Sequence, residues 1–135
     1  MTELLVPISP GELIDKITIL EIKSQRMRDA VKLANVRTEL ALLMDTWQAS
    51  PWSAADIAAE WADLRAVNEK LWVVEDEIRD KERDARFDQG FIELARAVYV
   101  TNDERAAIKK RINTRLGSTL VEEKSYADYT RSGSG

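Results

Sequence analysis

Apolar residues recur at helical spacing through most of this chain. The longest run repeats at separations of three, four and seven residues, with members Ile57, Trp61, Leu64, Leu71, Val74 and Ile78. That period is typical of a helix packed in a bundle. The chain holds only 5 glycines and 3 prolines, and none of them separates short alternating stretches that would indicate strands. The pattern therefore predicts an all-α fold built around a long central helix at residues 56–86.

Two stretches have the residue pattern of a helix start. Ser9-Pro10-Gly11-Glu12 combines a serine N-cap, a proline at the first helical position and a glutamate three residues after the cap. Thr101-Asn102-Asp103-Glu104 has the same Thr-x-x-Glu capping box, and Gly117 stands where a C-cap is expected. With the apolar spacing, these signals predict about five helices, the first two separate or joined through a bend, over residues 10–28, 33–47, 56–86, 91–99 and 101–116.

The length of 135 residues and the apolar fraction of 44% fit one domain with its own core. We expect a single helical domain over residues 1–131, with an extended N-terminal arm at residues 4–8 laid on the helices. Residues 118–129 are expected to form a C-terminal tail docked on the helical body. Residues 132–135 have the composition of a flexible linker.

Composition excludes several kinds of function. Cysteine and histidine are both absent, which removes the usual zinc sites, thiol nucleophiles and imidazole bases. The lack of cysteine fits a cytoplasmic protein, no signal peptide is evident, and no apolar stretch is long enough to span a membrane. The formal charge of -4 makes nucleic acid an unlikely partner, so the cations at residues 109–111 fit a solvated face.

The polar segment from Tyr99 to Arg105 is the best candidate for a binding site. A helix start at Thr101 would present free backbone N–H groups between the cations Arg96 and Arg105, an arrangement that favours anion binding. The same residues also fit a purely structural role. In that case Thr101 and Glu104 only cap the helix, and the cations complement the acidic central helix.

We therefore expect a helical, non-catalytic protein that binds a small anionic molecule (phosphorylated, nucleotide-like or a sugar phosphate), needs no cofactor and forms a homo-oligomer. Arg96, Arg105 and Lys124 would neutralise the anion, and Tyr99 or Tyr126 would stack on a ring. The complete predicted site comprises Glu12, Asp15, Lys16, Arg96, Tyr99, Thr101, Asn102, Asp103, Arg105, Glu123, Lys124, Ser125 and Tyr126.

Two other functions remain open. Carboxylates three residues apart share a helix face, so facing pairs could hold Mg²⁺, as in a helical nucleoside-triphosphate pyrophosphohydrolase. The chain has three such pairs, Glu12 with Asp15, Glu60 with Asp63, and Glu77 with Asp80. The second possibility is a protein–protein interaction module, in which the apolar seam of the central helix pairs with another helix.

Three stretches carry a resemblance to a known family: residues 9–23 (SPGELIDKITILEIK), 91–103 (FIELARAVYVTND) and 122–126 (EEKSY). Over residues 4–129 the chain resembles a family of short bacterial proteins catalogued only as a domain of unknown function. The resemblance implies a coherent natural fold and names no activity, ligand or catalytic residue. It also implies that the polar residues of the three stretches belong together.

Overall fold

The computed structural model describes residues 3–129, which form four α-helices and no strand. The helices are α1 (Pro10–Arg26), α2 (Ala30–Ala49), α3 (Ala58–Arg83) and α4 (Gln89–Leu116). The all-α prediction is confirmed, whereas the expected number of about five helices is wrong. The linker predicted at residues 132–135 lies outside the described residues. None of the four helices has the length and apolar character needed to cross a membrane.

The prediction of a fifth helix depends on a helix start at Thr101. Thr101 instead lies in the middle of α4, where it is fully buried. The helix begins earlier, with Asp88 as its N-cap accepting a hydrogen bond from the Phe91 N–H at 3.0 Å. No glycine or proline stands between Gly90 and Gly117, so nothing breaks the helix, and a Thr-x-x-Glu sequence is compatible with a helix interior.

The predicted N-cap of the first helix and the predicted C-cap of the last helix are correct. The Ser9 hydroxyl accepts a hydrogen bond from the Glu12 N–H at 3.2 Å, with Pro10 in the first turn of α1. Gly117 ends α4 in the left-handed conformation, at φ 67°, which costs glycine little because it has no Cβ. A new cap at Asp29, which accepts from the Lys32 N–H, separates α2 from α1.

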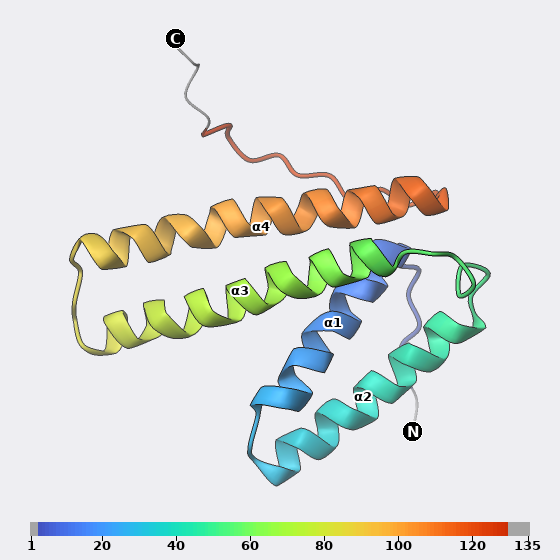
Figure 1. Cartoon of the computed structure of the whole chain (residues 1–135), viewed down its shortest axis with the longest axis horizontal. Coiled ribbons are helices and arrows are strands. Elements are labelled where there is room, and N and C mark those ends of the chain that lie inside the picture. Colours follow the sequence, from blue (N-terminus) through green and yellow to red (C-terminus); the bar gives the residue numbers. More distant parts are fainter. Residues whose placement is uncertain (1–2, 130–135) are drawn as a thin grey trace.

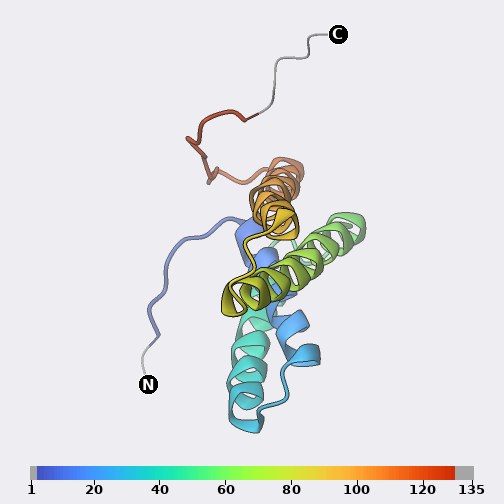
Figure 2. The same cartoon turned by 90° about the vertical axis from the view of Figure 1, so that its left-hand side faces the viewer.

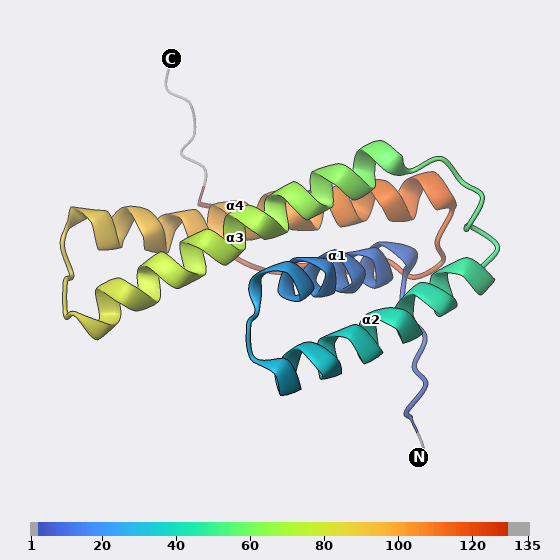
Figure 3. The ribbon, with the colours of Figure 1, turned by 60° about the horizontal axis from the view of Figure 1, so that its bottom comes forward.

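Helix α1 is the centre of the structure, since it packs against α2, α3 and α4. Figure 1 shows α3 and α4 as two long antiparallel rods, with α1 and α2 packed near one end of the pair. Figure 3 shows α1 lying between α2 and the α3–α4 pair. The opposite end of the α3–α4 pair, around the turn at residues 84–88, projects beyond α1 (Figure 1).

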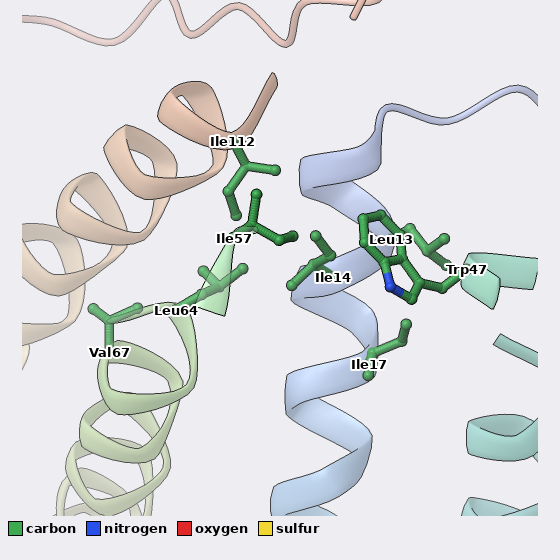
Figure 4. Packing of buried hydrophobic residues seen from close by; sticks show 8 residues of the cluster. All are labelled: Leu13, Ile14, Ile17, Trp47, Ile57, Leu64, Val67 and Ile112. Carbon is green, nitrogen blue, oxygen red and sulfur yellow. The ribbon is translucent and has the colours of Figure 1, made fainter. Parts of the chain in front are cut away.

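The side chains of α1 explain this central position, because they are buried on two sides. Figure 4 shows Ile14 directed towards Leu64 of α3 and Ile112 of α4, and Leu13 and Ile17 directed towards Trp47 of α2. Ile14 and Ile17 are fully buried. Burial of a residue of this size is worth about 1.5–3 kcal/mol, so the double apolar face of α1 holds the two halves of the molecule together.

The N-terminal arm leaves the helical body, as Figure 2 shows. Leu4 is 95% and Leu5 90% exposed, so the expectation that the arm is laid on the helices is wrong. The first turn of α1 is already covered by α4, with Pro10 and Gly11 buried. The core therefore closes without the arm.

The closest approach of α1 to α4 occurs at Gly11. Its N–H donates to the side-chain Oδ1 of Asn113 at 2.7 Å, and a Cβ at this position would lie 2.6 Å from the Lys109 carbonyl oxygen. We expect Gly11→Ala to destabilise the protein by about 2 kcal/mol, because the two helix backbones would have to separate. Urea denaturation measures this loss.

Gly90→Ala is the matched control. Its Cβ would meet the mobile end of the Lys81 side chain at 3.0 Å rather than backbone. Alanine is also a better helix former than glycine by roughly 0.5–1 kcal/mol, so this variant should be unchanged or more stable. Equal losses from the two substitutions would show that no close helix contact exists at Gly11.

Candidate functional site

A carboxylate is buried at the junction of three helices. Asp15 of α1 is only 1% exposed. The Arg105 guanidinium of α4 donates two hydrogen bonds to the Asp15 carboxylate, from Nε to Oδ1 at 2.8 Å and from Nη2 to Oδ2. This bidentate pairing is strong and directional. It raises the pKa of Arg105, chiefly through the hydrogen bond to Asp15, so the cation is fixed in place.

Asn68 of α3 completes the coordination of Asp15. Its Nδ2 donates to the same Asp15 Oδ1 at 2.9 Å and to the hydroxyl of Thr18 at 3.0 Å. The Thr18 hydroxyl in turn donates to the Asp15 carbonyl oxygen at 2.9 Å. The buried charge is thus compensated by groups from α3 and α4, as a charge in a protein interior requires.

A second polar cluster lies one turn away on both α1 and α4. The Lys109 ammonium pairs with Glu12 of α1 at 2.6 Å and with Glu122 of the tail at 2.7 Å, although its side chain is only 9% exposed. Burial would lower the pKa of Lys109, but the hydrogen bonds that it donates to the two glutamates and the nearby negative charges outweigh burial and raise the pKa. Gly11–Asn113, Glu12–Lys109 and Asp15–Arg105 thus form a polar ladder between the antiparallel helices.

The tail, residues 118–129, turns back along α4 (Figure 1) and contacts it at several points. Beyond Glu122, the Lys124 ammonium lies 3.5 Å from the Asn102 carbonyl oxygen and 3.8 Å from the Asp103 carboxylate. The Tyr129 ring packs edge-on against Tyr99, with centroids 5.1 Å apart. A hydrogen bond to Asp103 raises the pKa of Tyr129.

Two of the hollows between the tail and α4 adjoin each other. The charged hollow, of about 240 Å³, is lined by Glu12, Asn102, Arg105, Ala106, Lys109, Glu122 and Lys124. The aromatic hollow, of about 800 Å³, is lined by Val98, Tyr99, Asn102, Asp103, Lys124, Tyr126, Ala127, Asp128 and Tyr129. Asn102 and Lys124 belong to both, so the two hollows adjoin.

The hollows bring together seven of the predicted site residues, from the first helix, the last helix and the tail. They are Glu12, Tyr99, Asn102, Asp103, Arg105, Lys124 and Tyr126. The three stretches singled out in the sequence therefore meet in space at this point.

The other six predicted residues lie outside these hollows. Asp15 is buried beneath Arg105, Lys16 is half-exposed beside Glu12 at 3.8 Å, and Ser125 is exposed. Glu123 lines a separate hollow with Lys110 and Asn113.

Thr101 and Arg96 are separated from the hollows by the geometry of α4. Thr101 is buried, and within the described part of the chain its hydroxyl has no hydrogen-bond partner. Arg96 is exposed and lies nine residues before Arg105, which is about half a turn around the helix axis. The two arginines therefore point in opposite directions from α4.

The expected anion site at a helix N-terminus is wrong. Residues 102–104 lie within α4, where backbone N–H groups are used by the helix itself. Any anion must therefore be held by side chains. The cations next to the tail are Arg105, Lys109 and Lys124.

Sequence reasoning missed Lys109, Glu122, Tyr129 and Asn68 as members of this region. Asn68 did carry a signal, since it occupies an apolar-seam position four residues after Leu64 and three before Leu71. A polar residue at such a position is buried and needs a partner. Lys109 follows Arg105 by one helical turn, but only the position of α1 shows which acids it meets.

Five of the six carboxylates of the magnesium hypothesis are paired with cations, including Asp80 with Arg83. Glu60 pairs with Arg115 and Asp63 with Arg111, and Glu12 and Asp15 belong to the clusters above. Across residues 3–129, no group of three or more acidic side chains is placed to hold a metal ion. The apolar seam of the interaction-module hypothesis is largely buried within the chain, at Ile57, Leu64, Leu71 and Val74.

Asp15→Asn should cost about 3 kcal/mol of unfolding free energy, because the half-buried Arg105 would lose its counter-charge. Asp63→Asn is the matched control, since the Asp63–Arg111 pair is more than half exposed and should be worth less than about 1 kcal/mol. Urea denaturation of both variants tests the comparison. Similar small losses would mean that the buried pair does not anchor α1 to α4.

The raised pKa of Lys109 predicts a pH dependence. Its pairing stabilises the fold fully below the usual lysine value of 10.5 and is lost as the pH rises through the higher value of the folded state. The difference in unfolding free energy between wild type and Lys109→Met should therefore stay constant from neutral pH to about the usual lysine pKa of 10.5 and decrease at higher pH. A gap that persists in strong alkali would contradict the assignment.

Comparison with known proteins places the chain in a family. No curated protein and no solved structure matches it. A family model described as "Family of unknown function (DUF6165)" matches residues 4–134, nearly the whole chain. The resemblance noted from the three stretches is thereby confirmed, and the chain belongs to this family of unknown function.

Proposed function

We propose that the protein binds a small phosphorylated molecule beneath its tail. The observation that carries this proposal is the junction of the charged and aromatic hollows at Asn102 and Lys124. A molecule with a phosphate group and a ring could occupy both hollows at once. Nucleotides and aryl phosphates have this composition.

The phosphate would take a place that the protein now fills with its own carboxylate. Lys109 is held by Glu12 of α1 and by Glu122 of the tail. The Glu122 side chain is 48% exposed on a segment without helix or strand, so it is the more easily displaced partner. A phosphate beside Lys109 would also lie near Arg105 and Lys124, which line the same hollow and would strengthen its binding.

The ring would lie among tyrosines. Tyr99, Tyr126 and Tyr129 line the aromatic hollow, and Tyr126 is 82% exposed. Lys124 lies 5.8 Å from the centre of the Tyr126 ring, so the cation and the aromatic surface are already adjacent. Stacking of a base on an aromatic side chain is worth about 1–3 kcal/mol, enough to favour ring-bearing phosphates over inorganic phosphate.

Isothermal titration of the full chain with phenyl phosphate, AMP and inorganic phosphate tests the proposal. We expect AMP and phenyl phosphate to bind more tightly than inorganic phosphate. Lys124→Ala and Tyr126→Ala should each weaken that binding by roughly tenfold, because one removes a cation and the other a ring. Neither residue belongs to the helical core, so both variants should fold.

Arg37→Ala is the matched control, since it removes an exposed cation from α2, on the far side of α1 from α4 (Figure 3). Its binding should equal that of wild type. Equal weakening in Lys124→Ala and Arg37→Ala would indicate non-specific charge attraction. No heat of binding from AMP or phenyl phosphate would overturn the proposal.

A further inference from the structure

Another hollow lies where the C-terminal half of α1 meets α3 and α4, on another side of Arg105. We propose that this end hollow binds a neutral planar ring with an amide edge, meaning an N–H group next to a carbonyl oxygen. The end hollow has a volume of about 500 Å³. Its walls carry the apolar side chains Ile19, Ile22, Leu71 and Trp72, and its polar members include Asn68 and Arg105.

The orientation of the Asn68 amide is fixed by chemistry. A carboxylate can only accept hydrogen bonds, so the group that faces Asp15 must be the NH₂ of Asn68. That NH₂ donates to Asp15 and to Thr18, which uses both of its hydrogens. The carbonyl oxygen of Asn68 has no partner within residues 3–129, and the residue is 95% buried against the end hollow. The Asn68 carbonyl oxygen can therefore accept a hydrogen bond from a ligand in the end hollow.

Arg105 supplies the complementary donor. Its Nε and one hydrogen of Nη2 are committed to Asp15, which leaves the Nη1 hydrogens for another acceptor. Arg105 and Asn68 both line the end hollow and meet at the same Asp15 oxygen through Nε and Nδ2, so the remaining donor and the remaining acceptor belong to neighbouring side chains of one hollow. A ligand edge that carries an N–H beside a carbonyl oxygen satisfies both of them.

The surroundings favour a flat, uncharged ligand. Trp72 is only partly buried and lines the hollow next to Leu71. The Arg26 guanidinium lies 6.0 Å from its ring centre, so a ligand ring would stack on the part of the indole that faces the hollow. Glu75 and Asp76 also line the hollow; Glu75 is paired with Arg79, and Arg105 is neutralised by Asp15. With no uncompensated cation among these groups, an anion gains nothing here, in contrast to the charged hollow.

This site is independent of the proposed phosphate site. Lys124, Lys109 and the tyrosines of the tail do not line the end hollow. Failure of one site therefore leaves the other intact. The two share Arg105 and Asn102, so their occupants would lie on different sides of the same two side chains.

Benzamide and uracil are suitable probes, because each presents an N–H next to a carbonyl oxygen on a flat ring. The measurement is a titration of the ¹⁵N-labelled full chain, followed through the indole N–H signals of the 4 tryptophans; Trp72→Phe identifies the Trp72 signal. We expect a saturable shift of the Trp72 indole and of the Asn68 side-chain amide. The Trp47 and Trp52 signals should stay unchanged.

The donor requirement is tested without altering the protein. N,N-dimethylbenzamide and 1,3-dimethyluracil keep the ring and the carbonyl but lack the N–H, so they should bind roughly tenfold more weakly because the Asn68 oxygen stays unpaired. Trp72→Ala should lose the binding of benzamide, whereas the neighbouring exposed-face variant Val73→Ala should keep it.

The possible outcomes decide the proposal. Tight binding of the parent probes and weak binding of their methylated forms would establish the amide-edge site. Equal binding of both forms would show a merely apolar cleft and overturn the assignment. The absence of a saturable shift with benzamide and uracil up to their solubility limits would overturn it as well.

Discussion

The ion pair between Asp15 and Arg105 is the interaction on which the rest of the structure depends. A carboxylate at 1% exposure is tolerated only with full compensation, because desolvation of a charge costs several kcal/mol. The compensating groups come from α3 and α4, so α1 cannot occupy its central place unless both helices stand in register. The apolar contacts of α1 supply most of the favourable energy, and the buried charge selects which arrangement of the helices is used.

The same constraint shapes the charged hollow and the end hollow. Since Asp15 fixes the Arg105 guanidinium, that side chain stands as a partition between the charged hollow and the end hollow. One turn further along α4, the Lys109 ammonium pairs with Glu12 of α1 and with Glu122 of the tail. Asp15 and Glu12 hold Arg105 and Lys109 in fixed positions. A ligand of these cations would therefore have to fit around the two carboxylates, which restricts its shape.

Much of the fold could be predicted from the sequence, because the signals were local. The cap at Ser9, the stop at Gly117 and the spacing from Ile57 to Ile78 depend on a few neighbouring residues, and the structure has all three. The failure at Thr101 has a physical cause as well. A capping box describes how a helix start is satisfied once it exists, but it does not create one. Because no glycine or proline stands between Gly90 and Gly117, the chain stays helical through Thr101.

The site was less accessible to prediction for a related reason. Arg105, Lys124 and Tyr99 could be selected as polar residues in distinctive stretches, and they do lie together. The pairing of Lys109 with Glu12 and Glu122, and of Asn68 with Asp15, joins residues 13 to 97 positions apart along the chain. No spacing rule connects such residues, so their partners became visible only when α1 was placed against α3 and α4.

The polar ladder between α1 and α4 also has a consequence for the order of folding. The α1–α2 and α3–α4 pairs each join across a short turn, whereas Gly11 and Asn113 are 102 residues apart in the chain and Asp15 and Arg105 are 90 apart. Closing a loop of that length costs entropy before any contact repays it. The two helical hairpins should therefore form first and dock last. If the contacts of the polar ladder form only after the folding transition state, they slow unfolding and leave the folding rate unchanged.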